Sequence, residues 1–262
     1  MINFKTLISA SIVLTGSLAV TEMQADDTPT WGQGNPVEIY GCSFTDGVNG
    51  YEQSQKFAAS WNQWADKQGA FGSHVAQLMW AEFSDGEYPS DFTWLGYWDN
   101  YADAGKDMDI RATNGSSIYK EANEFLEQCA HSEWGAWELL AGGDWTKSNH
   151  ITEFSDCFYK EGKDDSDLLV ANIAYAEELA KRGMTGAAMG SGQLWPRAGS
   201  TTAAQNAVSF KWVRGYPNFA AYTAFTHALW NEGLGSVWGS LYADIVSCDS
   251  SRVYHSEVIR SP

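Results

Sequence analysis

The sequence predicts an α+β protein built from one strand–helix–strand–strand–helix–strand module that occurs twice. Two cysteine pairs mark the repeat, because Cys42 and Cys129 are separated by nearly the same length of chain as Cys157 and Cys248. Short segments near them also correspond: residues 79–80 to 194–195, 92–95 to 210–213, and 100–102 to 218–220. We therefore expect two modules, over residues 36–141 and 150–262.

The elements of the first module follow from its hydrophobic periodicity. Alternating apolar residues predict strands. Phe57, Trp61 and Trp64 share one helix face, and Gly69 supplies a helix stop. The expected order is a strand over 37–42, a helix over 51–69, strands over 75–83 and 92–98, helical segments broken at 114–115 and resuming over 118–126, and a strand over 134–140.

The second module shows the same order. Acidic residues 164, 165 and 167 crowd the start of its first helix, where carboxylates cap free amides. Leu169, Ile173, Ala176 and Ala180 are predicted to form the buried stripe of this helix, which Gly183 ends. The other expected elements are strands over 152–157, 187–195, 208–215 and 252–260, and helices over 218–230 and 237–245.

The start of the chain has the features of a secretory signal peptide. Lys5 precedes an apolar stretch over residues 7–20, and Ala25 offers a small-residue exit. The stretch is short for a membrane span. We expect residues 1–25 to be removed and the mature protein to be periplasmic or secreted, with a membrane anchor or a disordered N-terminus as the alternatives.

Export gives the cysteines a predicted role. An even number of cysteines in an oxidising compartment favours disulfides, and four cysteines allow three pairings. The repeat selects Cys42–Cys129 and Cys157–Cys248, because each module should close on itself. Zinc binding is the less favoured alternative, since no two cysteines are spaced as a zinc knuckle.

The element order is that of the ferredoxin-like split βαβ unit, in which the fourth strand lies antiparallel beside the first. Cys42 ends the first predicted strand, and Cys129 precedes the fourth. The predicted topology therefore brings the two together, as a disulfide requires. Each such sheet has helices on one face only, so we expect the two modules to pack sheet against sheet.

The sequence resembles the dimeric α+β barrel superfamily, especially its antibiotic-biosynthesis-monooxygenase-like branch, as a tandem single chain. The residues that carry the resemblance are 92–101 (FTWLGYWDNY) and 210–219 (FKWVRGYPNF), and the pattern extends over residues 36–262. It implies a pseudo-dimeric α+β barrel with a ligand site between sheet and helices or inside the barrel. Members include cofactor-free oxygenases and haem-handling enzymes, so the fold alone selects no activity.

The resemblance to haem-degrading members implies that His227, on the second helix of the second module, could be an axial ligand beside Trp212. The corresponding residue of the first module is Asp109, and the first-strand Asn of those members is missing. We therefore expect no cofactor, with haem as the alternative, and favour a histidine on the helix flank. The acidic residues near Gly105 lack calcium-loop spacing, so no metal is expected.

Carboxylates recur at matching positions. His255 and Glu257 share a face of the last predicted strand, and Glu257 corresponds to Glu138 when counted from the second cysteine of each pair. Glu38 likewise corresponds to Glu153. Such pairs could bind a cation or act as acid and base in a lumen. Glutamates of edge strands that face water are the favoured alternative.

Arg214 and Lys211 could hold an anionic group, as arginine does with two hydrogen bonds. Gly96 and Thr93 stand at their positions in the first module, so we expect any polar pocket in the second. Trp94 and Trp212 are either core residues or pocket walls. The catalytic candidates are His227, His255 and Arg214, and the ligand-binding candidates are Trp94, Trp212, Lys211, Glu138 and Glu257.

Composition restricts the partners. With 33 acidic and 16 basic residues, the net charge of −17 disfavours nucleic acid and anionic membranes. Thirteen tryptophans suit a core or a pocket for flat ligands. We expect an exported monomer with an internal pseudo-two-fold that binds a small apolar or aromatic ligand without catalysis. The alternative is a cofactor-free monooxygenase-like or haem-handling enzyme with its site in the second module.

Overall fold

The computed structural model describes residues 34–84, 90–143, 148–199 and 208–262. The predicted signal peptide, residues 1–25, lies outside these ranges. In the first half of the chain (residues 34–143) the elements are β1 (Asn35–Phe44), α1 (Gly50–Gln68), β2 (His74–Phe83), β3 (Phe92–Trp98), α2 (Tyr101–Asn114), α3 (Ser116–Ala122) and β4 (Leu126–Leu140).

The second half (residues 148–262) has the same kinds of element. They are β5 (His150–Tyr159), α4 (Asp165–Lys181), β6 (Gly190–Ala198), β7 (Phe210–Tyr216), α5 (Phe219–Asn231), α6 (Leu234–Tyr242), β8 (Val246–Cys248) and β9 (Arg252–Arg260). In the described part of the chain, no helix has the length and apolar character needed to cross a membrane.

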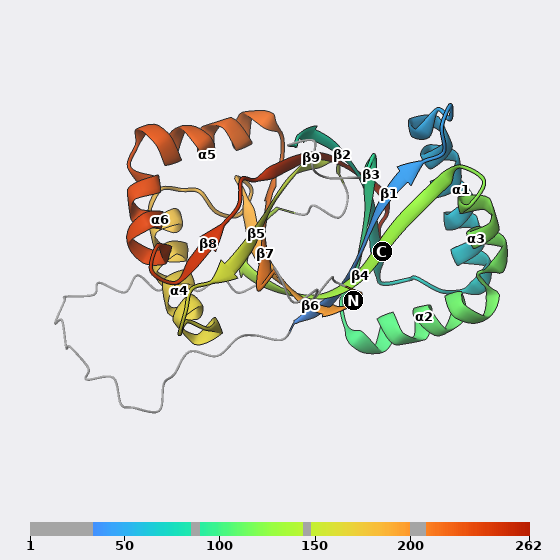
Figure 1. Cartoon of the computed structure of the whole chain (residues 1–262), viewed down its shortest axis with the longest axis horizontal. Coiled ribbons are helices and arrows are strands. Elements are labelled where there is room, and N and C mark those ends of the chain that lie inside the picture. Colours follow the sequence, from blue (N-terminus) through green and yellow to red (C-terminus); the bar gives the residue numbers. More distant parts are fainter. Residues whose placement is uncertain (1–33, 85–89, 144–147, 200–207) are drawn as a thin grey trace, which may run out of the picture.

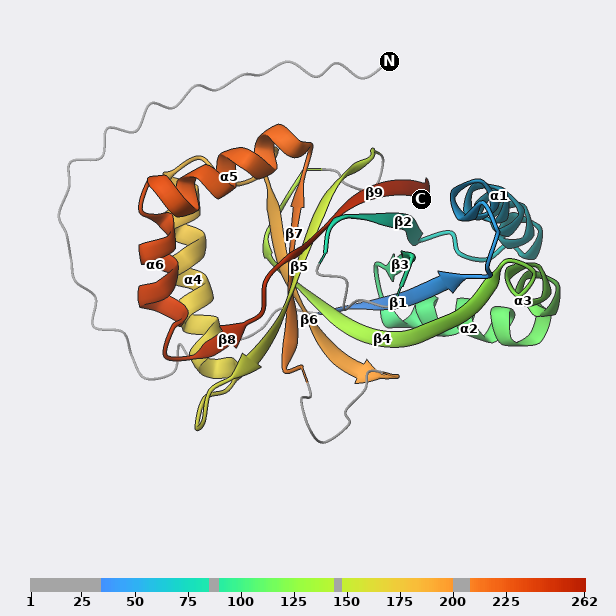
Figure 2. The ribbon, with the colours of Figure 1, turned by 45° about the horizontal axis from the view of Figure 1, so that its top comes forward.

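A closed antiparallel barrel of 8 strands forms the centre of the molecule (Figure 1). Its strand order is β7-β6-β4-β1-β3-β2-β9-β5, and β5 pairs again with β7 to close the ring. Helices α1, α2 and α3 cover one side, and α4, α5 and α6 cover the opposite side (Figure 2). The predicted α+β class and barrel are confirmed.

The two halves are joined by hydrogen bonds between strands and not only by packing of faces. β2 pairs with β9, and β4 pairs with β6, in both cases antiparallel. The expectation that two open sheets would pack face to face is therefore incomplete. Pairing satisfies the backbone groups at what would otherwise be four exposed strand edges. The lumen then has its own apolar cluster, distinct from the two clusters under the helices.

Both predicted disulfides are present. Cys42 lies directly opposite Cys129 in the β1–β4 register, and Cys157 lies opposite Cys248 in the β5–β8 register. The first strand of each half therefore does lie beside the strand that follows its last helix. In the second half that strand is divided into β8 and β9, both of which pair with β5.

Most element boundaries agree with the periodicity, and two predictions are wrong. The strand predicted over 134–140 begins at Leu126, because the mostly exposed residues 126–133 carry no alternating pattern that would reveal their pairing with β1. The buried face of α4 consists of Leu168, Ala171, Asn172, Tyr175 and Leu179. The predicted stripe through Ile173 is thus on the wrong face, and Ile173 is exposed.

Removal of one disulfide should destabilise the whole domain. Each bridge closes a long loop, and loss of such a bridge from a folded protein costs about 2–5 kcal/mol on the chain-entropy model. We expect Cys42→Ala/Cys129→Ala and Cys157→Ala/Cys248→Ala each to lower the free energy of unfolding, measured with urea, by that amount. A change below about 0.5 kcal/mol in either double variant would contradict a stabilising role for that bridge.

Candidate ligand-binding cleft

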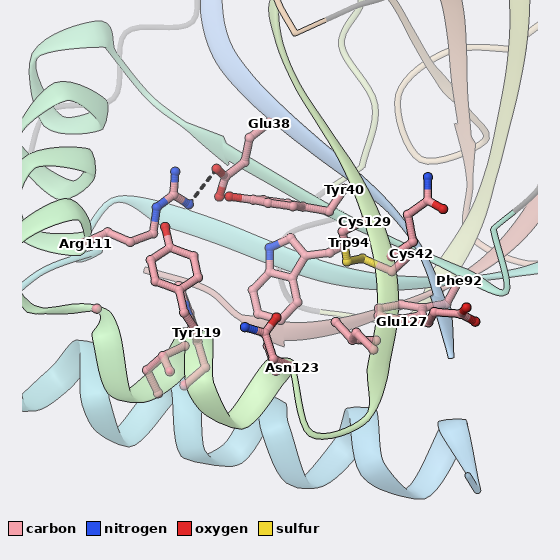
Figure 3. A pocket seen from close by; sticks show the side chains of 16 residues that line it. Glu38, Tyr40, Cys42, Phe92, Trp94, Arg111, Tyr119, Asn123, Glu127 and Cys129 are labelled. Carbon is pink, nitrogen blue, oxygen red and sulfur yellow. Dashed lines mark hydrogen bonds and ion pairs between the residues drawn. A yellow bond between two sulfur atoms is a disulfide. The ribbon is translucent and has the colours of Figure 1, made fainter. Parts of the chain in front are cut away.

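A cleft of about 300 Å³ lies between the sheet and the helices of the first half (Figure 3). β1 and β3 form one wall, and α3 with the start of β4 forms the other. Five of the sixteen lining residues are aromatic: Tyr40, Trp61, Phe92, Trp94 and Tyr119. The Cys42–Cys129 disulfide lies at one end of the cleft, and Glu38 and Arg111 lie at the other (Figure 3).

Glu38 is a buried carboxylate surrounded by basic groups. Its side chain is 1% exposed, and Arg111 Nη1 donates a hydrogen bond of 2.7 Å to its Oε2 atom. The nearest ring nitrogens of His131 and His74 lie 3.3 and 3.8 Å from its oxygens. Burial alone would raise the pKa of Glu38, but the interactions with His131, Arg111 and His74 lower it to about 2. This carboxylate is therefore charged at neutral pH.

Tyr40 connects this charged end to the aromatic wall. Its ring stacks on the His131 ring with centroids 3.8 Å apart and an interplanar angle of 5°. The Arg111 guanidinium lies 5.9 Å from the centre of the same ring. Burial, together with the nearby Glu38 charge, raises the pKa of Tyr40, so its hydroxyl stays protonated. Tyr40 can thus donate a hydrogen bond but is a poor base.

His74 is fully buried behind Glu38. Its ring packs against Trp98, with centroids 4.3 Å apart, and against Trp61 and Phe71. Neither ring nitrogen has a hydrogen-bond partner in the described part of the chain. Burial lowers the pKa of His74 to about 4, although Glu38 opposes this shift. Gly96 makes room for the ring, since a Cβ at position 96 would lie 2.4 Å from His74 Nε2.

The second half makes a similar ion pair but fills the corresponding space. Glu153 lies opposite Arg214 in the β5–β7 register, just as Glu38 lies opposite Gly96 in the β1–β3 register. Arg214 Nη1 is 3.4 Å from the Glu153 carboxylate, and Tyr216 donates a 2.7 Å hydrogen bond to it. The Arg214 guanidinium lies 5.2 Å from the centre of the Trp212 ring. Buried Trp212, Tyr175 and Tyr242 pack edge to face beneath the helices.

The prediction that edge glutamates face water is wrong for Glu38 and Glu153. Their exposed fractions are 1% and 7%, because barrel closure leaves neither strand at an edge. Arg214, for which we expected a role in a polar pocket, is itself buried against Glu153 and aromatic rings. Arg214 is the residue that led us to expect the pocket in the second half, and its own side chain occupies that space.

The three catalytic candidates occupy different environments. His227 lies on α5 with 62% of its side chain exposed, near Asn231 and 3.5 Å from Glu232. His255 is on β9, opposite Trp80 and Ile151 in the barrel wall. Haem does not fit the residues at His227, because the imidazole is at the surface and buried aromatic rings occupy the space under α5 and α6. No group of three or more metal-ligating side chains occurs in the described ranges.

The predicted ligand-binding residues are likewise dispersed. Trp94 lines the cleft, whereas Trp212 belongs to the core of the second half. Lys211 points into the barrel and forms an ion pair of 2.5 Å with Asp156. Glu257 accepts hydrogen bonds from Tyr51 and Gln55 of α1. Glu138 borders a second cavity, inside the barrel.

The sequence did not identify Arg111, Tyr40 and His131 as site residues. The one signal for the charged end of this site in the sequence is that Glu38 and Glu153 stand at matching distances from the cysteines. The arginine partners come from different elements, α2 in one half and β7 in the other, so no comparison of the two repeats could reveal Arg111.

Comparisons with known proteins give the fold but no family. No family model matches the chain, and no curated protein matches its sequence. A candidate monooxygenase from Lactobacillus acidophilus NCFM is 11% identical with a TM-score of 0.54, covering 87% of this chain and 95% of that one. A candidate monooxygenase from Fusobacterium nucleatum is 9% identical with a TM-score of 0.51, covering 87% and 94%. The likeness shows the fold alone, an α+β protein with a closed antiparallel barrel.

Stability should fall with acidification because of His74. The folded protein keeps His74 neutral down to a pKa of about 4, whereas the unfolded chain takes up a proton below its ordinary value of 6.5. The unfolded state therefore binds more protons in this window, and stability decreases as the pH falls from 7 to 4. The shift corresponds to about 3 kcal/mol.

We expect wild type to lose about 3 kcal/mol more than His74→Leu between pH 7 and pH 4, measured by urea unfolding. The exposed His227→Leu is the matched control and should behave as wild type. Glu38 contributes only at lower pH, because its charged form is lost between 4.5 and about 2. Equal losses in wild type and His74→Leu would contradict the assignment.

Proposed function

We propose that the protein binds a small, flat, apolar or aromatic molecule in the cleft of the first half, and that it does so without catalysis. The observation that carries this proposal is the composition of the cleft. Aromatic side chains line a space of about 300 Å³ that ends at an arginine held in place by a buried carboxylate. Mostly apolar walls with a few fixed polar groups are typical of small-molecule sites.

Arg111 is the group that would recognise a polar atom of the ligand. In the described part of the chain, its side chain donates one hydrogen bond, to Glu38. A guanidinium has five N–H donors in a fixed plane, so several remain for a ligand. Because Glu38 already balances the charge of Arg111, a carbonyl or hydroxyl oxygen suits the site without a full negative charge. We therefore expect an aromatic ligand that carries one such oxygen.

The electrostatics favour binding over acid–base catalysis. A general base works best with a pKa near the operating pH, and Glu38 is shifted to about 2, away from that value. Burial raises the pKa of Tyr40, which removes it as a base. The ring of His74 is neutral but enclosed by Trp61, Phe71 and Trp98.

The alternative is a monooxygenase-like enzyme without a cofactor, and the barrel fold is what favours it. Such an enzyme would consume dioxygen in the presence of an aromatic substrate, whereas a binding protein would not. The haem-handling alternative predicts a Soret band in the purified protein. The exposed position of His227 leads us to expect none.

We further propose that the halves are tandem copies of one ferredoxin-like module, over residues 36–141 and 150–262. The matching strand pairs, disulfide registers and buried glutamates support this. We also propose that a signal peptide directs the chain to an oxidising compartment, which would suit the two disulfides. A monomer would then carry the internal pseudo-two-fold that related barrels build from two chains.

Two variants and two probes test the cleft. Arg111→Met should weaken binding of 2-naphthol about tenfold or more, because a hydrogen bond to a charged group is lost, but should leave naphthalene binding unchanged. Ala122→Trp, at the cleft wall, should weaken both probes. Isothermal titration calorimetry provides the affinities, and Arg182→Met, at the C-cap of α4, is the control for loss of a half-buried arginine outside the cleft.

Equal affinity of wild type and the folded Ala122→Trp variant for both probes would exclude the cleft as the binding site. Dioxygen uptake that depends on 2-naphthol and on Arg111 would replace the binding proposal with the enzymatic alternative.

A further inference from the structure

A second cavity lies inside the barrel. Its volume is about 500 Å³, within the range of small-molecule sites. It is separate from the cleft because successive residues of a strand face opposite sides. On β1, Val37 borders this cavity and Glu38 borders the cleft; on β3, Leu95 borders the cavity and Trp94 borders the cleft.

Glycines make part of this space available. Gly190 and Gly192 of β6 and Gly215 of β7 belong to the lining, and Gly190 lies opposite Gly215 in the β6–β7 register. A side chain at residue 192 would not fit, since its Cβ would lie 2.8 Å from the Trp137 carbonyl oxygen. These three positions thus contribute backbone to a wall where side chains would otherwise fill the barrel.

Beyond this cavity the barrel interior narrows to a small space of about 40 Å³, which Lys211 and Arg252 border. Trp134, Phe154 and Tyr254 belong to an apolar cluster that occupies the middle of the lumen. Beyond it, Asp156 binds Lys211 at 2.5 Å and Arg252 at 3.3 Å. Phe154 borders both the cavity and this smaller space and so lies between them. Exposed Glu138 marks its open side.

Gln77 is the feature that points to a ligand. Its side chain borders the cavity and is 3% exposed, yet it makes no hydrogen bond within the described ranges. Neither amide atom of Gln77 is among the described side-chain atoms that are fully enclosed without a partner, so the amide is accessible from the cavity and can bond to a molecule there. Thr152, by comparison, borders the same cavity and shares a 2.7 Å hydrogen bond with Ser256.

The charges around the cavity exclude one class of ligand. The described lining contains no lysine or arginine, and its acidic member is Glu138. Burial lowers the pKa of His150, another lining residue, so this imidazole is neutral near pH 7. Nothing in this lining would compensate a negative charge.

We propose that the barrel lumen is a second binding site, for an uncharged, mainly apolar molecule with an N–H or O–H group that bonds to the Gln77 amide. Val37, Leu95 and Val213 would contact its apolar part. The site is independent of the cleft, and unlike the cleft its described lining contains no arginine.

The test uses N-phenyl-1-naphthylamine, an uncharged fluorescent probe with one N–H group, and its N-methyl derivative. Wild type should bind both with increased fluorescence. Gln77→Leu should weaken the N–H probe about tenfold, as expected for one buried hydrogen bond, and leave the N-methyl probe unchanged. Val213→Phe and Ala136→Phe, on different strands of the cavity wall, should each weaken both probes at least tenfold.

Folding of each variant is checked by circular dichroism. Val213→Phe and Ala136→Phe both fill the cavity, so the test still works if one of them does not fold. Ala122→Trp, which fills the cleft, should bind both probes as wild type does. The proposal is overturned if a folded filling variant binds the probes with wild-type affinity, or if Ala122→Trp abolishes binding. Loss of 2-naphthol binding in Ala122→Trp with retention of these probes separates the two sites.

Discussion

Closure of the barrel is the constraint on which the other features of this structure depend. Each of the eight strands has two neighbours, and the pairs β2–β9 and β4–β6 supply the contacts that neither half could make alone. In a closed ring, successive side chains of each strand point alternately into the barrel and out of it. The adjacent residues Val37 and Glu38 therefore border different spaces, the cavity inside the barrel and the cleft under the helices. It also buries both faces of β1 and β5, so a charged residue on either strand requires a partner.

The two halves meet that requirement in different ways, and the difference determines where a cleft exists. Arg214 reaches Glu153 from the neighbouring strand, and its guanidinium lies against Trp212 and Phe225 in the space beneath the helices. In the first half Gly96 stands at that register position, and the arginine comes from α2. Arg111 thus lies at the end of the space between sheet and helices rather than across it. One ion pair fills the interior, and the other borders a cavity.

This difference also explains which parts could be predicted from the sequence. β3 and β9 have the bounds that the sequence predicts. The pairing of the cysteines could be predicted because each repeat contains one pair. The charged end of the cleft could not be predicted, because Arg111 becomes a partner of Glu38 only through the packing of α2 on β1. The α4 stripe failed for a related reason: Asn172 is buried by hydrogen bonds to Gln193 and Tyr242, which apolar periodicity cannot anticipate.

The Cys42–Cys129 bond connects stability with recognition. In the second half, Cys157 is fully buried within the apolar core, and its bond to Cys248 lies beside packed side chains. In the first half, both cysteines border the cleft, so the covalent link joins β1 to the start of β4 at one end of the cleft. A wall fixed before the ligand arrives loses less conformational freedom on binding. The same bond at the same register therefore links the corresponding strands in both halves, and in the first half it also fixes the shape of the proposed binding site.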